Sequence, residues 1–233
     1  MSEKSRQLFG TDGIRARVNR YPLTPEFVVR LGQVVADIFL ARRVGAMTWP
    51  TVVIGKDTRQ SCDMLECAIA AGLTSRGIDV QLAGVIPTPA VAMMTRHSGA
   101  LFGIVISASH NPFEDNGVKF FGPDGYKFDD SLEAEIEDRL FSAHEASSSD
   151  SVGRIAALPD ATDQYIAYVC NSVGNDRELF RGLTVALDAA NGSSFRTSEA
   201  ILHALGAKVL PCHHHPSGIN TVSYTHLTLP TSD

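Results

Sequence analysis

The sequence predicts an α/β protein in which a layered, mostly parallel or mixed sheet forms a first domain, followed by an incomplete second domain of similar type. Two observations lead to this prediction. Short apolar runs typical of strands alternate with segments of helical periodicity along the 233 residues, which is the pattern of layered α/β domains. A polar, serine-rich segment at 146–153 divides the pattern in two. We therefore expect a first domain over 1–150 and a partial second domain over 151–220.

The first domain is expected to begin with a helix that packs on the sheet. Thr24 is a good N-cap and Pro25 suits the first helical position. Apolar residues then recur at helical spacing to about Arg42. A strand follows at 52–54, and then a helix over 63–76.

The second helix carries its own end signals. Asp63 and Glu66 have the spacing of a capping box, and Gly77 suits the C-terminal cap. After it, Asp130 and Glu133 have the same capping spacing at the start of the domain's last helix. The other expected elements are strands at 79–82, 102–106 and 118–121, helices at 87–97 and 130–143, and a turn at 123–125.

The second half repeats the alternation without completing a domain. We expect helices at 161–172 and 194–205 and strands at 183–187 and 208–210. Together they form one β-α-β unit, which is less than a full layered domain.

Composition restricts the class of partner. The net charge is −6 and no basic cluster occurs, which argues against a nucleic-acid or anionic membrane surface. No apolar run approaches the 18 or so residues of a membrane span. The four cysteines show no Cys-x-x-Cys spacing, and the N-terminus has no secretion signal. We expect a cytoplasmic protein whose partners are small molecules; the oligomeric state stays open.

The most informative segment is 103–121, where an apolar strand runs into a loop with a serine and a histidine. Asn111 and Pro112 force the chain out of the strand, which leaves Ser109 on a loop at the strand's carboxyl end. Open α/β sheets bind ligands at that edge.

Four segments in order resemble the α-D-phosphohexomutase family, and most of all its bacterial phosphoglucosamine mutase branch. They are FGTDGIR at 9–15, IGKDTR at 54–59, SASHNP with DNGVKFF at 107–121, and LDAANG at 187–192. The resemblance covers about residues 8–220 and implies a phosphoglucomutase-like first domain. It also implies conversion of glucosamine 6-phosphate to glucosamine 1-phosphate, in amino-sugar synthesis for the cell wall, through a phosphoserine and a bisphosphorylated sugar.

The resemblance assigns roles to four residues. Ser109 is the expected phosphoryl carrier, and its phosphate is an expected ligand of Mg²⁺, whose other ligands lie outside this chain. Lys119 is the expected acid or base at the sugar hydroxyl, and Arg15 a phosphate-binding cation; both would bind the hexosamine phosphate. His110 is expected to orient the phosphate or the loop. Since this chain holds one half of an active-site cleft, we expect it to be inactive alone.

Several alternatives stay open. A sibling mutase acting on glucose or mannose phosphates has the same motifs, because the sugar-selecting loop is not in this chain. A serine hydrolase using Ser109 with His110 is disfavoured, since adjacent residues rarely form a nucleophile–base hydrogen bond and no Gly-x-Ser-x-Gly occurs. Arg59 is either catalytic or, as we favour, part of a buried ion pair stabilising the loop around Asp57.

The remaining features are interpreted conservatively. Ala16 stands where the family has glycine, and strain is expected there if the backbone requires a positive φ. Cys62 replaces the small residue expected after Ser61. Three consecutive histidines at 213–215 alternate in direction and are expected to form a loop rather than a metal site. Residues 221–233 fit no continuation of the family and look similar to translated sequencing-adaptor readthrough.

Overall fold

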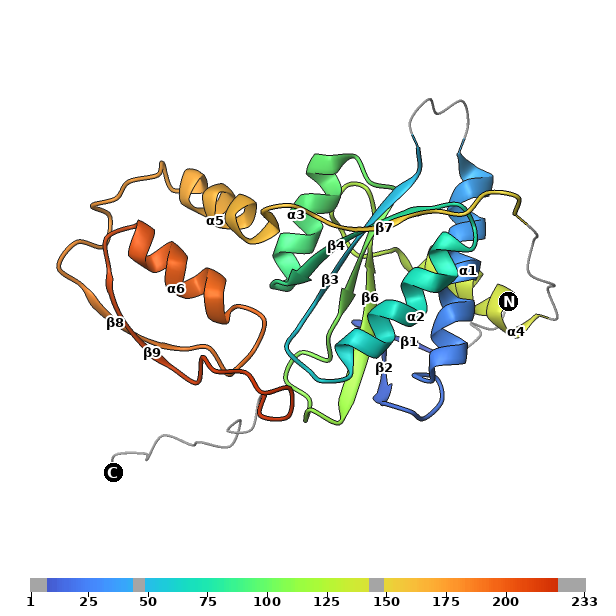
Figure 1. Cartoon of the computed structure of the whole chain (residues 1–233), viewed down its shortest axis with the longest axis horizontal. Helices are drawn as coiled ribbons and strands as arrows, with labels where there is room; N and C mark the ends of the chain where they lie inside the picture. Colours follow the sequence, from blue (N-terminus) through green and yellow to red (C-terminus); the bar gives the residue numbers. More distant parts are fainter. Residues whose placement is uncertain (1–7, 44–48, 143–148, 222–233) are drawn as a thin grey trace.

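A computed structural model describes residues 8–43, 49–142 and 149–221. The described chain forms two units, a larger one built on a seven-stranded sheet and a smaller one with two strands (Figure 1). The mixed α/β architecture predicted from the sequence is confirmed.

The seven-stranded sheet has the order β1-β2-β6-β5-β3-β4-β7. Strands β5, β3, β4 and β7 are parallel, whereas β6, β2 and β1 join antiparallel. The sheet is therefore mixed, with its parallel part at one side. The strands are β1 Phe9–Gly10, β2 Gly13–Arg17, β3 Thr51–Lys56, β4 Asp79–Val85, β5 Phe102–Ile106, β6 Asp115–Phe121 and β7 Ile155–Ala157.

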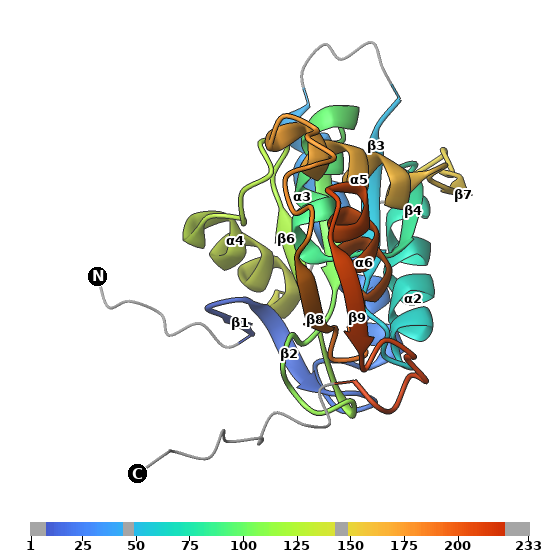
Figure 2. The same cartoon turned by 90° about the vertical axis from the view of Figure 1, so that its left-hand side faces the viewer.

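Helices cover both faces of this sheet. Successive strand residues point to opposite faces, so Val52 and Ile54 of β3 join the core beneath α1, α2 and α4, while Val53 joins a second core beneath α3. Figure 1 shows α3 on one side of this sheet and α1, α2 and α4 on the other, and Figure 2 looks onto the sheet with the smaller unit in front. The helices are α1 Pro25–Arg42, α2 Cys62–Thr74, α3 Thr88–Ser98 and α4 Asp130–Phe141.

Helix α3 approaches the sheet closely because β5 carries a glycine beneath it. A Cβ at Gly103 would lie 2.1 Å from the Thr95 hydroxyl oxygen, a distance that no side chain tolerates. This contact lies between the last turns of α3 and the start of β5, at the end of the strand away from Ser109.

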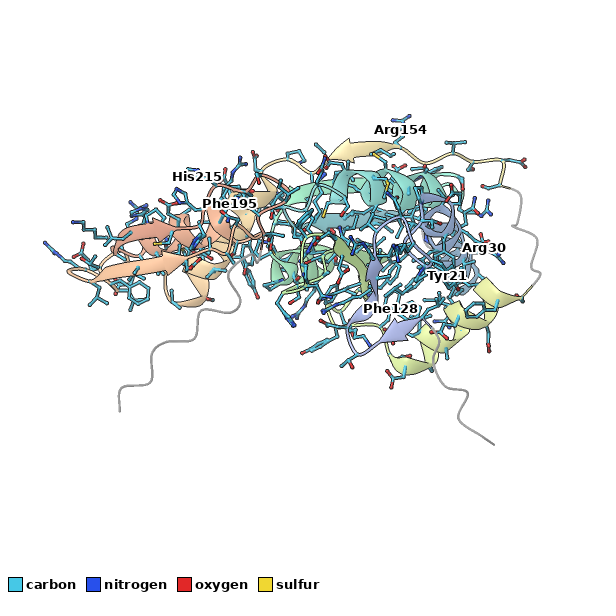
Figure 3. All side chains as sticks on the ribbon, turned by 90° about the horizontal axis from the view of Figure 1, so that it is seen from below. Tyr21, Arg30, Phe128, Arg154, Phe195 and His215 are labelled. Atoms are coloured by element: carbon cyan, nitrogen blue, oxygen red, sulfur yellow. The ribbon has the colours of Figure 1, made fainter. Side chains whose placement is uncertain are left out.

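The smaller unit is one β-α-β unit, as the sequence predicts. Its parallel strands β8, Thr184–Asp188, and β9, Lys208–Cys212, are joined by α6, Phe195–Ala204. Helix α5, Ala161–Ser172, packs against both α6 and α3 and so connects the two units. Figure 3 shows Phe195 and His215 on the smaller unit and Phe128 and Arg30 on the larger one.

Two predicted caps are wrong. Ser61, not a residue of a capping box, precedes α2, and both Asp63 and Glu66 bind the Lys56 ammonium instead. The N-cap of α4 is Asp129, whose carboxylate accepts the Leu132 N–H at 2.8 Å. In α2 both carboxylates pair with Lys56 instead of capping the helix, and in α4 the cap lies one residue before Asp130.

Other expectations concern single segments. Helix α1 has the predicted bounds, and Thr24 Oγ1 accepts the Phe27 N–H. Ala16 lies in β2 opposite Asn116 without a positive φ, so the strain expected there is absent. Strands β1, β2 and β7 are not predicted from the sequence. Residues 146–148 of the linker expected at 146–153 and tail residues 222–233 lie outside the described residues.

Strand β7 lies on the C-terminal side of the domain boundary expected near residue 150. This strand pairs in parallel with β4, so the larger sheet continues to Ala157, beyond the boundary expected near residue 150. At the other end, Thr221 is buried and its hydroxyl lies 3.5 Å from the Ala190 carbonyl oxygen.

Candidate active site

A cleft of about 500 Å³ lies between the two units. One wall contains the loops after β3 and β5 together with the start of α3, and the other contains the loop before α6. Carboxyl ends of parallel strands and helix starts thus meet at one place, which is where open α/β sheets bind ligands. The residues that line the cleft are Asp57, Pro87, Thr88, Pro89, Ser107, Ser109, His110, Lys119, Ala189, Ala190, Gly192, Ser193, Ser194 and Thr221.

Ser109 has an unusual backbone conformation. Its φ is +57°, in the left-handed region that residues other than glycine, asparagine and aspartate seldom adopt. Its N–H donates to the Ser107 hydroxyl at 3.0 Å. Strain of this kind is frequent at functional sites. Ser109 lies at the cleft as expected, and the neighbouring His110 is exposed and lines the same cleft.

Lys119 reaches the cleft from the middle of β6. Its neighbours Val118 and Phe120 face the core under α1, so alternation directs Lys119 to the other face. The lysine side chain is only 11% exposed, and its Nζ donates to Asp12 Oδ2 at 2.8 Å. This hydrogen bond is the largest cause that lowers the pKa of the Asp12 carboxyl.

Arg15 is connected to this pair but does not line the cleft. Its guanidinium pairs with the same Asp12 oxygen, and its Nε is buried without a hydrogen-bond partner. The structure therefore brings Ser109, His110 and Lys119 together at the cleft. Arg15 lies outside the cleft and is linked to Lys119 through Asp12. Asp12, which lies inside the matched segment 9–15, is not among the site residues predicted from the sequence.

The opposite wall has strained backbone of its own. Ala190 and Asn191 both have positive φ, +57° and +48°. The buried Asn191 is held from the first unit, because the Thr58 hydroxyl donates to its carbonyl oxygen at 2.5 Å. This contact ties the loop before α6 to the loop after β3, and no local sequence pattern predicts it.

The loop after β3 contains the predicted buried ion pair. Arg59 Nε and Asp57 Oδ2 lie 2.9 Å apart, and both side chains are buried. Cys62 packs beneath them with its Sγ 3.1 Å from Asp57 Oδ1. Burial is the largest cause that raises the pKa of this thiol, and the adjacent Asp57 charge adds to it. Cys62 thus fills the space as a neutral group.

The three histidines lie in a loop, as expected. His213 Nδ1 lies 3.0 Å from Asp188 Oδ2. Within residues 8–43, 49–142 and 149–221, no three His, Cys, Asp or Glu side chains are grouped so that they could hold a metal ion. Over the same residues, no helix has the length and apolar character needed to cross a membrane.

Comparison with known proteins extends this description. Residues 6–147 match the family model for phosphoglucomutase/phosphomannomutase, alpha/beta/alpha domain I. The phosphoglucosamine mutase of Azoarcus sp. is 46% identical over 217 residues, which are 93% of this chain and 48% of that protein. The phosphoglucosamine mutase of Cereibacter sphaeroides is 48% identical over 216 residues, 93% of this chain and 47% of that protein.

Solved structures give the same answer. A phosphoglucomutase/phosphomannomutase family protein from Burkholderia thailandensis has a TM-score of 0.75 at 25% identity, covering 91% of this chain and 44% of its own. A putative phosphomannomutase from Thermus thermophilus has a TM-score of 0.75 at 26% identity, with 91% and 46% covered. The chain spans about half the length of these relatives. Since the family model matches more than half of the chain, this protein belongs to the phosphoglucomutase/phosphomannomutase family.

Proposed function

We propose that this chain supplies the serine loop and one wall of the active site of a phosphoglucosamine mutase. The observation that carries the proposal is Ser109 in a left-handed conformation at a cleft shared by two units, with Lys119 on the same wall. The relatives named phosphoglucosamine mutase, at 46% and 48% identity, support the choice of reaction. The substrate would be glucosamine 6-phosphate and the product glucosamine 1-phosphate.

The proposed reaction uses a phosphate carried on Ser109. The bond between phosphorus and the serine oxygen breaks, and a new bond forms between phosphorus and a sugar hydroxyl oxygen. The hydroxyl proton is taken up by a base, and the serine oxygen is left as an alkoxide that must be protonated. After the bisphosphorylated sugar has reoriented, the reverse transfer returns the other phosphoryl group to Ser109. Each step conserves the phosphoryl group.

Lys119 and Arg15 are proposed to neutralise charge during this transfer. Phosphoryl transfer depends mainly on positioning and on stabilising charge at the equatorial oxygens. The two cations converge on Asp12, so they already lie close enough to share one anion. The Lys119 ammonium can donate a proton to the sugar or serine oxygen, and the neutral amine of Lys119 can act as a base. His110 would orient the phosphate from the loop.

Mg²⁺ is the ion that the family implies, with the Ser109 phosphate as one ligand. It would neutralise phosphate charge when bound. The described residues do not complete such a site, because no carboxylate or histidine cluster accompanies Ser109. A magnesium ion prefers six oxygen ligands, and those beyond the phosphate would have to come from elsewhere in a longer protein.

The second candidate is a phosphoglucomutase or phosphomannomutase. The Thermus structure described as a putative phosphomannomutase shares the fold, and the chemistry at Ser109 is identical for these sugars. The two functions are separated by assaying a protein extended to the length of the relatives with glucosamine, glucose and mannose 6-phosphates. Preference for glucosamine 6-phosphate by kcat/KM supports our proposal, and preference for either neutral sugar contradicts it.

A further inference from the structure

The guanidinium of Arg59 uses all five of its N–H donors. Its side chain is 0% exposed, and Nε donates to Asp57 Oδ2 at 2.9 Å. The other four N–H groups donate to main-chain carbonyl oxygens of one segment. These acceptors are Ser109 at 3.0 Å, Asn111 at 2.9 Å, Pro112 at 2.6 Å and Asp115 at 3.1 Å.

Three of these carbonyls belong to the loop that carries the proposed nucleophile, and the fourth, that of Asp115, is at the first residue of β6. Strand β5 ends at Ile106 and β6 begins at Asp115, so the residues between them lack a complete strand ladder. Buried carbonyl groups need partners, since an unpaired one costs about 1–3 kcal/mol. Arg59 supplies these partners from a single rigid, planar group, and therefore the loop closes around it.

The hydrogen bonds from Arg59 also fix the backbone of Ser109. A serine at φ +57° is disfavoured relative to the extended or right-handed backbone, so another interaction must keep it there. The Ser109 carbonyl is bound by Arg59, and its N–H is bound by the Ser107 hydroxyl. Both polar groups of the strained residue are thus fixed, which determines where its side chain points.

We infer that Arg59 is a positioning residue, which holds Ser109 in its left-handed conformation and so presents the hydroxyl to the cleft. The inference rests on the proposed function for Ser109 as nucleophile, whereas the hydrogen bonds from Arg59 to the loop carbonyls are present in this chain whatever its function. Arg59 does not line the cleft. Asp57 offsets its charge through the 2.9 Å ion pair, so its action on the site is through geometry rather than through a free positive charge.

Lysine cannot replace this function. A lysine at position 59 keeps the positive charge but has three donors on one nitrogen and no planar fork. Arg59→Lys therefore keeps the charge beside Asp57 and loses most of the carbonyl bonds. The matched control is Arg76→Lys, because Arg76 is also buried and paired with a carboxylate, at 3.0 Å from Asp37, but lies just beyond the far end of α2.

The first test is amide hydrogen exchange in the 233-residue chain. The Asn111 and Asp115 amides bond within the loop, to the Ala108 and Pro112 carbonyls at 3.1 and 3.0 Å. We expect Arg59→Lys to speed their exchange at least about ten-fold over the parent, whereas Arg76→Lys changes it no more than global stability requires. Loop exchange equal in the two variants overturns the inference.

The second test is a double-mutant cycle with Ser109→Gly. Glycine adopts positive φ without strain, so its backbone at position 109 does not need the hydrogen bond from Arg59 to stay in that conformation. The loss of Tm caused by Arg59→Lys is expected to fall by about half in the Ser109→Gly background. An unchanged loss, or Arg59→Lys failing to fold in both backgrounds, would assign Arg59 a general role in stability and overturn the inference.

The third test is kinetic and uses the protein extended to the length of its relatives. Arg59→Lys is expected to lower kcat at least about 30-fold with KM changed less than about three-fold, because the nucleophile is displaced while the substrate contacts remain. Arg76→Lys should keep kcat within about three-fold of the parent. Near-normal kcat in Arg59→Lys contradicts the inference. An inactive parent would instead contradict the proposed function. The role of Arg59 in positioning Ser109 would then be decided by the exchange and stability tests.

Discussion

Lys119 and Asp12 are 107 residues apart in sequence, and the lysine Nζ lies 2.8 Å from the aspartate Oδ2. Arg15 pairs with the same oxygen. One carboxylate therefore occupies the point at which two proposed phosphate-binding cations meet. Because Asp12 is 55% exposed, an incoming anion can reach this point from solvent, and the carboxylate competes with it.

Asp12→Asn is expected to strengthen anion binding at neutral pH. Removing one negative charge beside two cations should increase the affinity for inorganic phosphate about three- to ten-fold. Isothermal titration calorimetry on the 233-residue chain measures it, with Asp163→Asn in α5 as a control of equal charge change. Weaker binding in Asp12→Asn would show that the aspartate aligns the cations rather than competing with the anion.

The lowered pKa of Asp12 determines the pH range over which its ion pair with Lys119 is present. The Lys119 hydrogen bond lowers the Asp12 pKa below its ordinary value of 3.8, so the pair stabilises the fold above that value and is lost as the pH falls through the lowered pKa. Between pH 5 and 8 the Asp12 charge is constant. We therefore expect the ratio of sulfate affinities of Asp12→Asn and parent to stay the same at pH 6 and pH 8, because sulfate, unlike phosphate, is a dianion at both pH values.

Phosphate is expected on Ser109 in the protein extended to the length of its relatives. The cleft is also lined by Ser107, Ser193 and Ser194, so peptide mapping by mass spectrometry must distinguish four serines. Ser109→Ala should carry no phosphate in this segment and should lose turnover, while Ser193→Ala keeps the phosphate. Phosphate mapped to Ser107, Ser193 or Ser194, or full activity in Ser109→Ala, would contradict the assignment.

Lys119→Met and Arg15→Ala are expected to lower kcat of the extended protein at least about 100-fold, as the loss of an acid–base or charge-stabilising group does. Circular dichroism must show that the fold is retained. Arg17→Ala is the control for Arg15, since it is an exposed arginine of the same strand. Activity within a few-fold of the parent would show that neither residue takes part in the transfer.

The sequence predicted regular elements better than the contacts that build the site. Helix α5 and strand β5 have the predicted bounds, because apolar periodicity and flanking turn residues are local signals. Strands β1, β2 and β7 were missed, since they are short or contain glycine and charge, and only their pairing defines them as strands. For the same reason Asp12 was missed: its partner Lys119 lies 107 residues away.

The cysteines offer a direct test of the packing around Asp57. Cys67 and Cys212 are exposed, while Cys62 and Cys170 are buried. Burial also raises the pKa of Cys62 and keeps it a thiol, and the thiolate is the reactive form. We expect two thiols to react promptly with Ellman's reagent in the native chain and four after unfolding. Prompt labelling of Cys62 would contradict the closed loop described here.

Thr58→Val is expected to loosen the two units. It removes the hydroxyl that donates to the Asn191 carbonyl at 2.5 Å while keeping the shape of the side chain, and Thr58→Ser keeps the hydroxyl. Losing one such bond costs about 1 kcal/mol, which corresponds to about 2–4 °C in Tm for a chain of this size.

The location of the effect is as informative as its size. The Asn191 amide donates to the His213 carbonyl at 2.6 Å, so its hydrogen exchange measures the order of the loop that faces Ser109. This exchange should rise in Thr58→Val and stay at the parent rate in Thr58→Ser. If both variants exchange like the parent, the main-chain bond from Gln60 N–H to the Gly218 carbonyl, 3.0 Å, is sufficient to join the units. In that case the width of the cleft does not depend on Thr58.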